Sequence, residues 1–298
     1  MSERFYAELP GRGVLEVAGA DRVAFLQGLV SNDVAKVSAE RAIFAALLTA
    51  QGRYLFDFFI LGAGDTLVLE TEAARIADLQ RRLGLYKLRS KVAITDASSR
   101  FAVAVGFGDE ALPALGLASP GAAEAFAGGM AFADPRLAQL GARLILPRGG
   151  NAYVVLEGAG FAPADAERYD RYRLALGVPD GSRDLGVEKA LLLESGFDEL
   201  NGIDWQKGCY MGQELTARMK YRALVKKRLL PVELDGPLPA PGTPILLNGA
   251  EAGEVQSGRD RLALALLRLD SLAAAESGAK LLAGGTRLTP SRPAWVRI

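Results

Sequence analysis

Residues 207–214 read Lys207-Gly208-Cys209-Tyr210-Met211-Gly212-Gln213-Glu214, and they hold the only cysteine of a 298-residue chain that has no histidine. Without histidine, neither a serine–histidine nor a cysteine–histidine nucleophile pair can form, and no histidine can bind a metal. One cysteine excludes an internal disulfide, a four-cysteine zinc site and an iron–sulfur cluster held by this chain alone. The chemistry must therefore come from carboxylates, cationic side chains, backbone groups, aromatic rings and one thiol, and no metal site is predicted.

The octapeptide 207–214 has the features of a ligand-binding turn. Glycines on both sides of Tyr210 and Met211 permit positive φ and a close approach of the backbone to a ligand. Residues 214–221 predict a helix, so that Gly212 and Gln213 lie near a helix N-terminus with free amide donors.

Cys209 has two interpretations. A lone cysteine is more often a small buried apolar side chain than a reactive thiol. If Cys209 is exposed, the neighbouring Lys207 and the helix N-terminus would favour its thiolate form. Both interpretations stay open at this point.

A cationic segment follows the octapeptide, although the whole chain is electrically balanced with 35 basic and 35 acidic residues. No acid lies between Glu214 and Glu233. Such a local concentration predicts contact with an anion, such as a carboxylate or phosphate tail. The alternative is a solvated basic face at a helix C-terminus. The six cations are Arg218, Lys220, Arg222, Lys226, Lys227 and Arg228.

Composition narrows the class of protein. Hydrophobic residues make up 50% of the chain, which is enough for packed cores. The balanced charge predicts no nucleic-acid partner. No stretch approaches the roughly 18 consecutive apolar residues of a membrane span, and the start MSERFYAELPGRG lacks the pattern of a targeting leader. With one cysteine, these features predict a cytoplasmic protein with no membrane partner.

Strand and helix patterns alternate along the first 220 residues, which is compatible with two similar α+β halves. Residues 42–49 and 54–61 predict a hairpin, and residues 143–147 and 153–156 predict a second one. Residues 165–176 predict a charged helix that ends at glycine.

The last region has a different pattern, with short apolar runs between glycine and proline turns from residue 227 onward. This pattern suits a small antiparallel barrel or sandwich of about 70 residues. We therefore expect three domains, of which the first two can interleave in sequence. They are 1–97 (α+β), 98–222 (α+β, carrying the octapeptide) and 223–298 (a β-barrel).

The octapeptide resembles the signature of the YgfZ family, folate-binding relatives of the glycine-cleavage T-protein, which is an aminomethyltransferase. The resemblance continues in order over nearly the whole chain. The further segments are Phe25–Val34 (FLQGLVSNDV), Ala50–Asp57 (AQGRYLFD), Tyr86–Val92 (YKLRSKV), Tyr172–Pro179 (YRLALGVP), Leu192–Ser195 (LLES) and Gly253–Ser257 (GEVQS).

This resemblance implies a three-domain cloverleaf, with two ferredoxin-like α+β regions, a C-terminal barrel and a central tetrahydrofolate site. Glu194 matches the carboxylate that binds the pterin ring, and a carboxylate can accept two parallel N–H bonds from such an edge. Lys227 or Arg228 matches a basic residue at the folate tail, and Asp57 matches the catalytic aspartate. Cys209 departs from the aminomethyltransferases, which carry an acid there, so the resemblance implies changed chemistry.

Three functions follow as hypotheses. The favoured one is a tetrahydrofolate-binding protein that supports assembly or repair of iron–sulfur clusters, with Cys209 as a working thiol and cluster carriers or client proteins as partners. The second is a folate-dependent one-carbon transferase that uses Asp57 as its acid or base. The third is a docking factor without catalysis. Catalytic turnover, the client proteins, the folate species and the oligomeric state stay open. The predicted cofactor-binding residues are Glu194, Lys207, Tyr210, Gln213, Arg218, Lys227 and Arg228.

Overall fold

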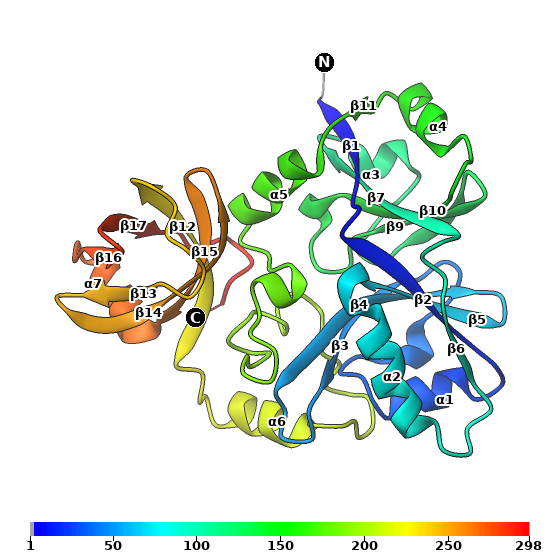
Figure 1. Cartoon of the computed structure of the whole chain (residues 1–298), viewed down its shortest axis with the longest axis horizontal. Coiled ribbons are helices and arrows are strands. Elements are labelled where there is room, and N and C mark those ends of the chain that lie inside the picture. The colour runs from blue at the N-terminus through cyan, green and yellow to red at the C-terminus, as the bar shows by residue number, and fades with distance from the viewer. Residues whose placement is uncertain (1–2, 298) are drawn as a thin grey trace. The chain divides into compact units, whose positions relative to one another are not determined.

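The computed structural model describes residues 3–297, and the chain forms two compact units (Figure 1). The first unit contains Met1–Leu48, Phe56–Tyr169 and Leu200–Met211, and the second contains Thr49–Leu55, Asp170–Glu199 and Gly212–Ile298. Residues 1–2 and 298, at the outer ends of the predicted first and third domains, lie outside the described residues. Within residues 3–297, no helix is long and apolar enough to cross a membrane.

The first unit is built on two sheets. The six-stranded sheet has the order β11-β1-β7-β10-β9-β8, and all its pairs are antiparallel except β1 with β11. The five-stranded sheet has the order β3-β4-β5-β2-β6. The strands of the first sheet are β1 (Arg4–Glu8), β7 (Phe101–Gly108), β8 (Ala123–Phe126), β9 (Gly129–Ala133), β10 (Ala142–Pro147) and β11 (Ala162–Pro163). Those of the second are β2 (Arg12–Ala18), β3 (Ile43–Leu48), β4 (Tyr54–Ala63), β5 (Thr66–Glu72) and β6 (Ala93–Asp96).

Helices cover these sheets because each has one apolar face. In α2 (Ile76–Lys87), the buried residues Ile76, Leu79 and Leu83 follow helical spacing, and this face packs on β2 and β6. The other helices that lie wholly in this unit are α1 (Arg22–Gln27), α3 (Ala111–Ala114) and α4 (Ala152–Gly158). The chain passes into the second unit within α5 (Ala166–Ala175).

The predicted hairpin at residues 42–61 is confirmed by the neighbouring strands β3 and β4. The first eight residues of β4 are all buried. A strand covered on both faces reads as a continuous apolar run rather than an alternating one, which explains the sequence YLFDFFIL at this place. Its single charged residue, Asp57, is therefore drawn into the core.

The second predicted hairpin is wrong, because only its first half is a strand. Residues 142–147 form β10, but residues 152–158 form α4. Val154 and Val155 lie on the outside of this helix, exposed by 69% and 39%. A run of four apolar residues has no period of its own, and β-branched side chains biased the prediction towards a strand.

The second unit contains a closed antiparallel barrel with strand order β12-β15-β14-β13-β16-β17 (Figure 1). Its interior is filled by Leu, Val, Ile and Ala side chains, among them Leu230, Val232 and Leu267. The barrel predicted from residue 227 onward is thus confirmed. Its strands are β12 (Lys227–Asp235), β13 (Pro244–Leu247), β14 (Ala250–Arg259), β15 (Leu262–Arg268), β16 (Leu281–Ala283) and β17 (Thr286–Pro290), and this unit also holds α6 (Gln213–Tyr221) and α7 (Leu269–Glu276).

Candidate functional site

The octapeptide is fastened to the first unit by the side chain of Lys207. Its ammonium group has three donors, and three backbone carbonyls around the end of α1 accept them. These belong to Gln27 (2.8 Å), Val30 (2.5 Å) and Asn32 (2.9 Å). Lys207 therefore anchors the loop, and its donors are used within the protein.

Two further contacts hold the same loop. The buried ring of Tyr210 lies 5.2 Å from the Lys207 ammonium, close enough for a cation–π contact. The backbone N–H of Met211 donates to the carbonyl oxygen of Gly28 at 3.1 Å. Between these fixed points, Cys209 is a free and exposed cysteine, so the buried-hydrophobe interpretation of this residue is wrong.

Burial lowers the pKa of Lys207 to about 8, although Asp33 and Asp204 act in the opposite direction. The ordinary lysine pKa is about 10.4, so between roughly pH 8 and 10 the unfolded chain binds more protons than the folded chain. Stability should therefore rise with pH in this window. We expect the native chain to gain thermal stability from pH 8 to 10 relative to a Lys207→Met variant, measured by melting temperature.

The matched control for this pH effect is Lys280→Met, because Lys280 is an exposed lysine of the second unit. That variant should keep the pH profile of the native chain. Parallel profiles for the native chain and Lys207→Met would contradict the assigned environment of Lys207.

Asp57 lies in a buried charge network of the first unit and is itself only 4% exposed. Burial would lower the pKa of Arg136, but Asp134 raises it above its ordinary value, with smaller contributions from Tyr169 and Asp57. Arg136 donates to Asp134 through two side-chain bonds of 2.9 and 2.7 Å.

The rest of this network centres on Glu70, which is fully buried. Arg143 donates to its carboxylate at 2.5 and 3.0 Å, and Arg12 forms a second ion pair with it. Burial would raise the pKa of Glu70, yet these two guanidinium groups lower it. Arg143 also lies 3.8 Å from Asp134, which joins the Glu70 cluster to the pair of Arg136 and Asp134.

The second unit places Glu194 beside the start of β12. Burial raises the pKa of this half-buried carboxyl, and the charges of Lys227 and Arg53 together with backbone N–H groups of Lys227 and Lys226 partly offset the rise. The Glu194 carbonyl also accepts from the N–H of Leu229 at 2.9 Å. The result is a partly desolvated carboxylate with two cationic side chains near it.

Lys227 and Arg228, which the resemblance could not separate, have different environments. Lys227 is partly exposed and acts on Glu194. Arg228 is 4% exposed, and it donates to the carbonyl of Leu193 at 2.7 Å and forms an ion pair with Glu199. Successive residues of a strand point to opposite faces, which explains the difference.

The glycine of the β3–β4 turn brings this turn against the octapeptide helix. Gly52 has φ +80°, and a Cβ atom there would lie 2.7 Å from the carbonyl oxygen of Gly212 and 2.8 Å from Leu215 Cβ. Only glycine allows this approach. The predicted helix is confirmed as α6, with Gln213 as its first residue and Arg218 exposed in its last turn.

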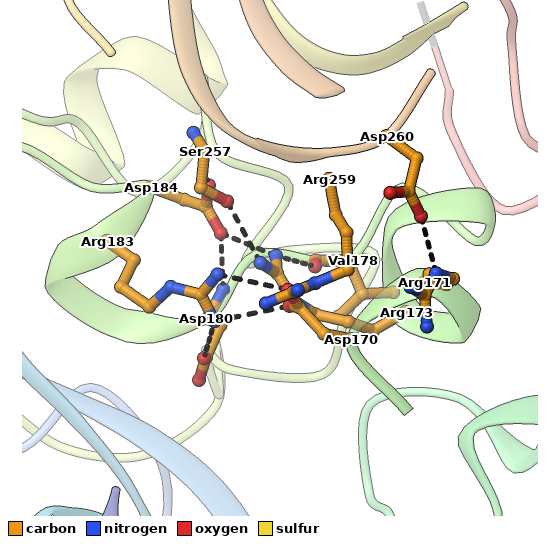
Figure 2. Close-up of polar contacts among 10 residues, drawn as sticks. All are labelled: Asp170, Arg171, Arg173, Val178, Asp180, Arg183, Asp184, Ser257, Arg259 and Asp260. Carbon is orange, nitrogen blue, oxygen red and sulfur yellow. Dashed lines mark hydrogen bonds and ion pairs between the residues drawn. The ribbon is translucent and has the colours of Figure 1, made fainter. Parts of the chain in front are cut away.

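A buried polar network joins two of the family-like segments within the second unit (Figure 2). Arg173, at the end of α5, donates to Asp170 (2.8 Å), Asp184 (2.6 Å) and Ser257 Oγ on β14 (2.9 Å). The N–H of Ser257 donates back to Asp184 at 3.1 Å. Further members of the network are Val178, Asp180, Arg183 and Arg259.

Two pairs of the sequence-predicted residues are brought together, one pair in each unit. Lys207 and Tyr210 are brought together in the loop that carries Cys209, and Asp57 lies in the buried network of the same unit. Glu194 and Lys227 are brought together in the other unit, whereas Arg228 points to Glu199. Arg53 was not predicted as a site residue, although it lies in Ala50–Asp57, one of the segments that carry the family resemblance. Within residues 3–297, no three Asp, Glu or Cys side chains are grouped to hold a metal ion.

Comparison with known proteins defines the class first. The chain matches the glycine cleavage system aminomethyltransferase T from Bartonella henselae with a TM-score of 0.75 over 99% of this chain and 87% of that one, at 15% identity. At this identity the match shows the fold alone: an aminomethyltransferase-like α+β fold with a C-terminal barrel, as the resemblance implied. Residues 226–298 match the family of the CAF17 C-terminal β-barrel domain.

Curated relatives then give the family. The chain is 34% identical to the iron–sulfur cluster assembly factor IBA57 of Mus musculus, over 89% of this chain and 77% of the relative. Its identity to the IBA57 protein of Homo sapiens is 35%, over 87% of this chain and 76% of the relative. The chain belongs to the IBA57 family of iron–sulfur cluster assembly factors. The comparisons confirm the class that the resemblance implied, and the family they name is IBA57 rather than YgfZ.

The predicted cytoplasmic location is wrong by these comparisons, because the relatives from Mus musculus and Homo sapiens are both named mitochondrial proteins. Balanced charge and one unpaired cysteine fit any reducing compartment. Composition therefore could not distinguish one such compartment from another.

Proposed function

We propose that this chain binds a tetrahydrofolate and supports the assembly or repair of iron–sulfur clusters through the thiol of Cys209. Its membership of the IBA57 family supports the cluster function. The observation that carries the proposal is the exposed Cys209 on a loop that Lys207 fastens at three carbonyls. Such a thiol is open to a partner while its backbone stays in place.

Cys209 can supply only one ligand to a cluster, since the sequence has no other cysteine and no histidine. A partner must provide the remaining ligands. This requirement makes cluster carriers and iron–sulfur client proteins the expected partners. The cluster is then cargo that passes between proteins.

The environment of Glu194 fits a folate. A partly desolvated carboxylate forms strong hydrogen bonds to a paired N–H edge, which the pterin ring offers. Lys227 and Arg53 supply positive charge near this carboxylate, and Lys227 is the better candidate for the folate tail because Arg228 is buried against Glu199. Tyr210, Gln213 and Arg218 remain predicted contacts, and Lys207 would act by holding the loop.

The folate site is tested by titrating the pure protein with tetrahydrofolate and following intrinsic tryptophan fluorescence. Glu194→Ala should weaken binding about 30-fold, which corresponds to about 2 kcal/mol for lost hydrogen bonds to a charged group. Glu251→Ala removes an exposed carboxylate on β14 and should leave the affinity unchanged. Equal affinity of the native chain and Glu194→Ala would refute the assigned folate site.

The transferase alternative has less support. Asp57 is buried and lies near Arg136, which pairs with Asp134. A general base needs access to the proton it removes. The docking alternative concerns a different surface, next to the end of α6.

A further inference from the structure

A cavity of about 390 Å³ lies in the second unit, next to the end of α6 and the start of α7. Its apolar wall includes Met219, Val225 and Leu269, and its charged wall includes Glu199 and Arg228. This cavity has the size of a small-ligand site, with an apolar body and a few polar groups. It is separate in residues from the Glu194 and Lys227 pair.

The charged wall is a buried ion pair. Arg228 and Glu199 side chains are 5% and 10% exposed and form this pair. Arg228 also donates to the carbonyl of Leu193 at 2.7 Å. Arg228 Nε and Glu199 Oε2 are covered, so the pair lines the cavity without offering these atoms to a ligand.

The apolar wall of the cavity is the part that a side chain of a partner protein would fill. A leucine-sized side chain suits the Met219, Val225 and Leu269 wall.

The surface beside the cavity points to a protein and to its charge. Tyr221 and Leu224 are 75% and 43% exposed, so apolar surface continues beyond the cavity. Arg222 and Lys226 are exposed next to them, in the stretch without acids between Glu214 and Glu233. An acidic segment with an apolar anchor is complementary to this surface.

We propose that this cavity and the adjoining residues Tyr221–Lys226 dock an acidic peptide segment of a partner protein, anchored by one apolar side chain. The identification of that partner as a cluster carrier or client rests on the proposed function. In this docking mode, Arg222 and Lys226 of the cationic segment contact a protein rather than folate.

The probe is a fluorescein-labelled peptide with one central leucine flanked by aspartates, and binding is measured by fluorescence anisotropy with the full chain. Its leucine-to-serine version should bind at least about tenfold more weakly, because burial of a leucine side chain is lost. Leu224→Glu should weaken the leucine peptide at least about tenfold by removing apolar contact and adding repulsion.

The matched control is Leu282→Glu, because Leu282 on β16 and Leu224 have the same 43% exposure. This variant should bind the peptide like the native chain. Equal binding of the leucine and serine peptides, equal weakening by both variants, or no binding at millimolar peptide would overturn the docking site. Folate titration does not measure this surface, and the Cys209→Ser variant does not alter it, so failure of the docking site is distinguishable from failure of the proposed function.

Discussion

Replacing Cys209 by serine is expected to abolish support of [4Fe–4S] enzymes in cells while leaving the fold intact. The substitution changes one exposed atom, and exposed changes away from buried features usually alter stability by less than about 0.5 kcal/mol. A serine hydroxyl stays protonated near neutral pH and is a poor iron ligand compared with a thiolate. The variant should therefore fold, bind tetrahydrofolate and fail in cluster support.

The measurement is the activity of a [4Fe–4S] dehydratase in cells that lack the native chain and carry each variant. A second variant combines Cys209→Ser with Ser291→Cys, which moves the thiol to another exposed position. This variant should also fail, because the fastened loop sets the place of the thiol. Full activity of Cys209→Ser would remove the thiol from the mechanism, and rescue by Ser291→Cys would remove the importance of its position.

The parts of the fold that were predictable from sequence are those with local signals. The β3–β4 hairpin, helix α6 and the barrel strands each carry a period or turn residues within about ten positions. Helix α4 was missed, since Tyr153–Leu156 is a short apolar run without a period. Glycine and asparagine before it signal a turn but do not say which element follows.

The residue types of the candidate site could be predicted from the sequence, but the contacts between these residues could not. The carbonyls that hold Lys207 lie 175 to 180 positions earlier in the chain. No local pattern connects residues so far apart in the chain. The sequence therefore suggested that Lys207 acts on the thiol of Cys209, whereas in the structure Lys207 anchors the loop. Similarly, Lys227 and Arg228 differ in burial because they point to opposite faces of β12. Only the closed barrel determines which of these faces is buried.

Replacing Arg173 by methionine is expected to destabilise the protein by about 3–5 kcal/mol, the cost of breaking a buried ion pair by removing one partner. Arg173 is 4% exposed and donates to two buried aspartates, Asp170 and Asp184. Methionine keeps similar length but offers no donor, so both carboxylates lose a partner. It also removes the bond to Ser257 Oγ that ties the α5 segment to β14.

The control is Arg171→Met, two positions earlier on the same helix. Arg171 pairs with Asp260 at 2.5 Å, and their side chains are 44% and 61% exposed (Figure 2). An exposed pair of this kind contributes at most about 1 kcal/mol. Urea unfolding followed by circular dichroism should therefore separate the two variants, and equal midpoints would contradict the role given to the network.

Acidity provides a second test of the same network. Burial would raise the pKa of Asp170, but Arg173, Arg183 and Arg259 hold it below the usual range. The stability that this carboxylate contributes is present above the ordinary aspartate pKa of about 3.9 and is lost as pH falls below it. The stability gap between the native chain and Arg173→Met should therefore be widest near pH 7 and narrow below about pH 4. A gap of constant size from pH 7 to pH 3 would mean that Asp170 does not depend on Arg173 for its charge.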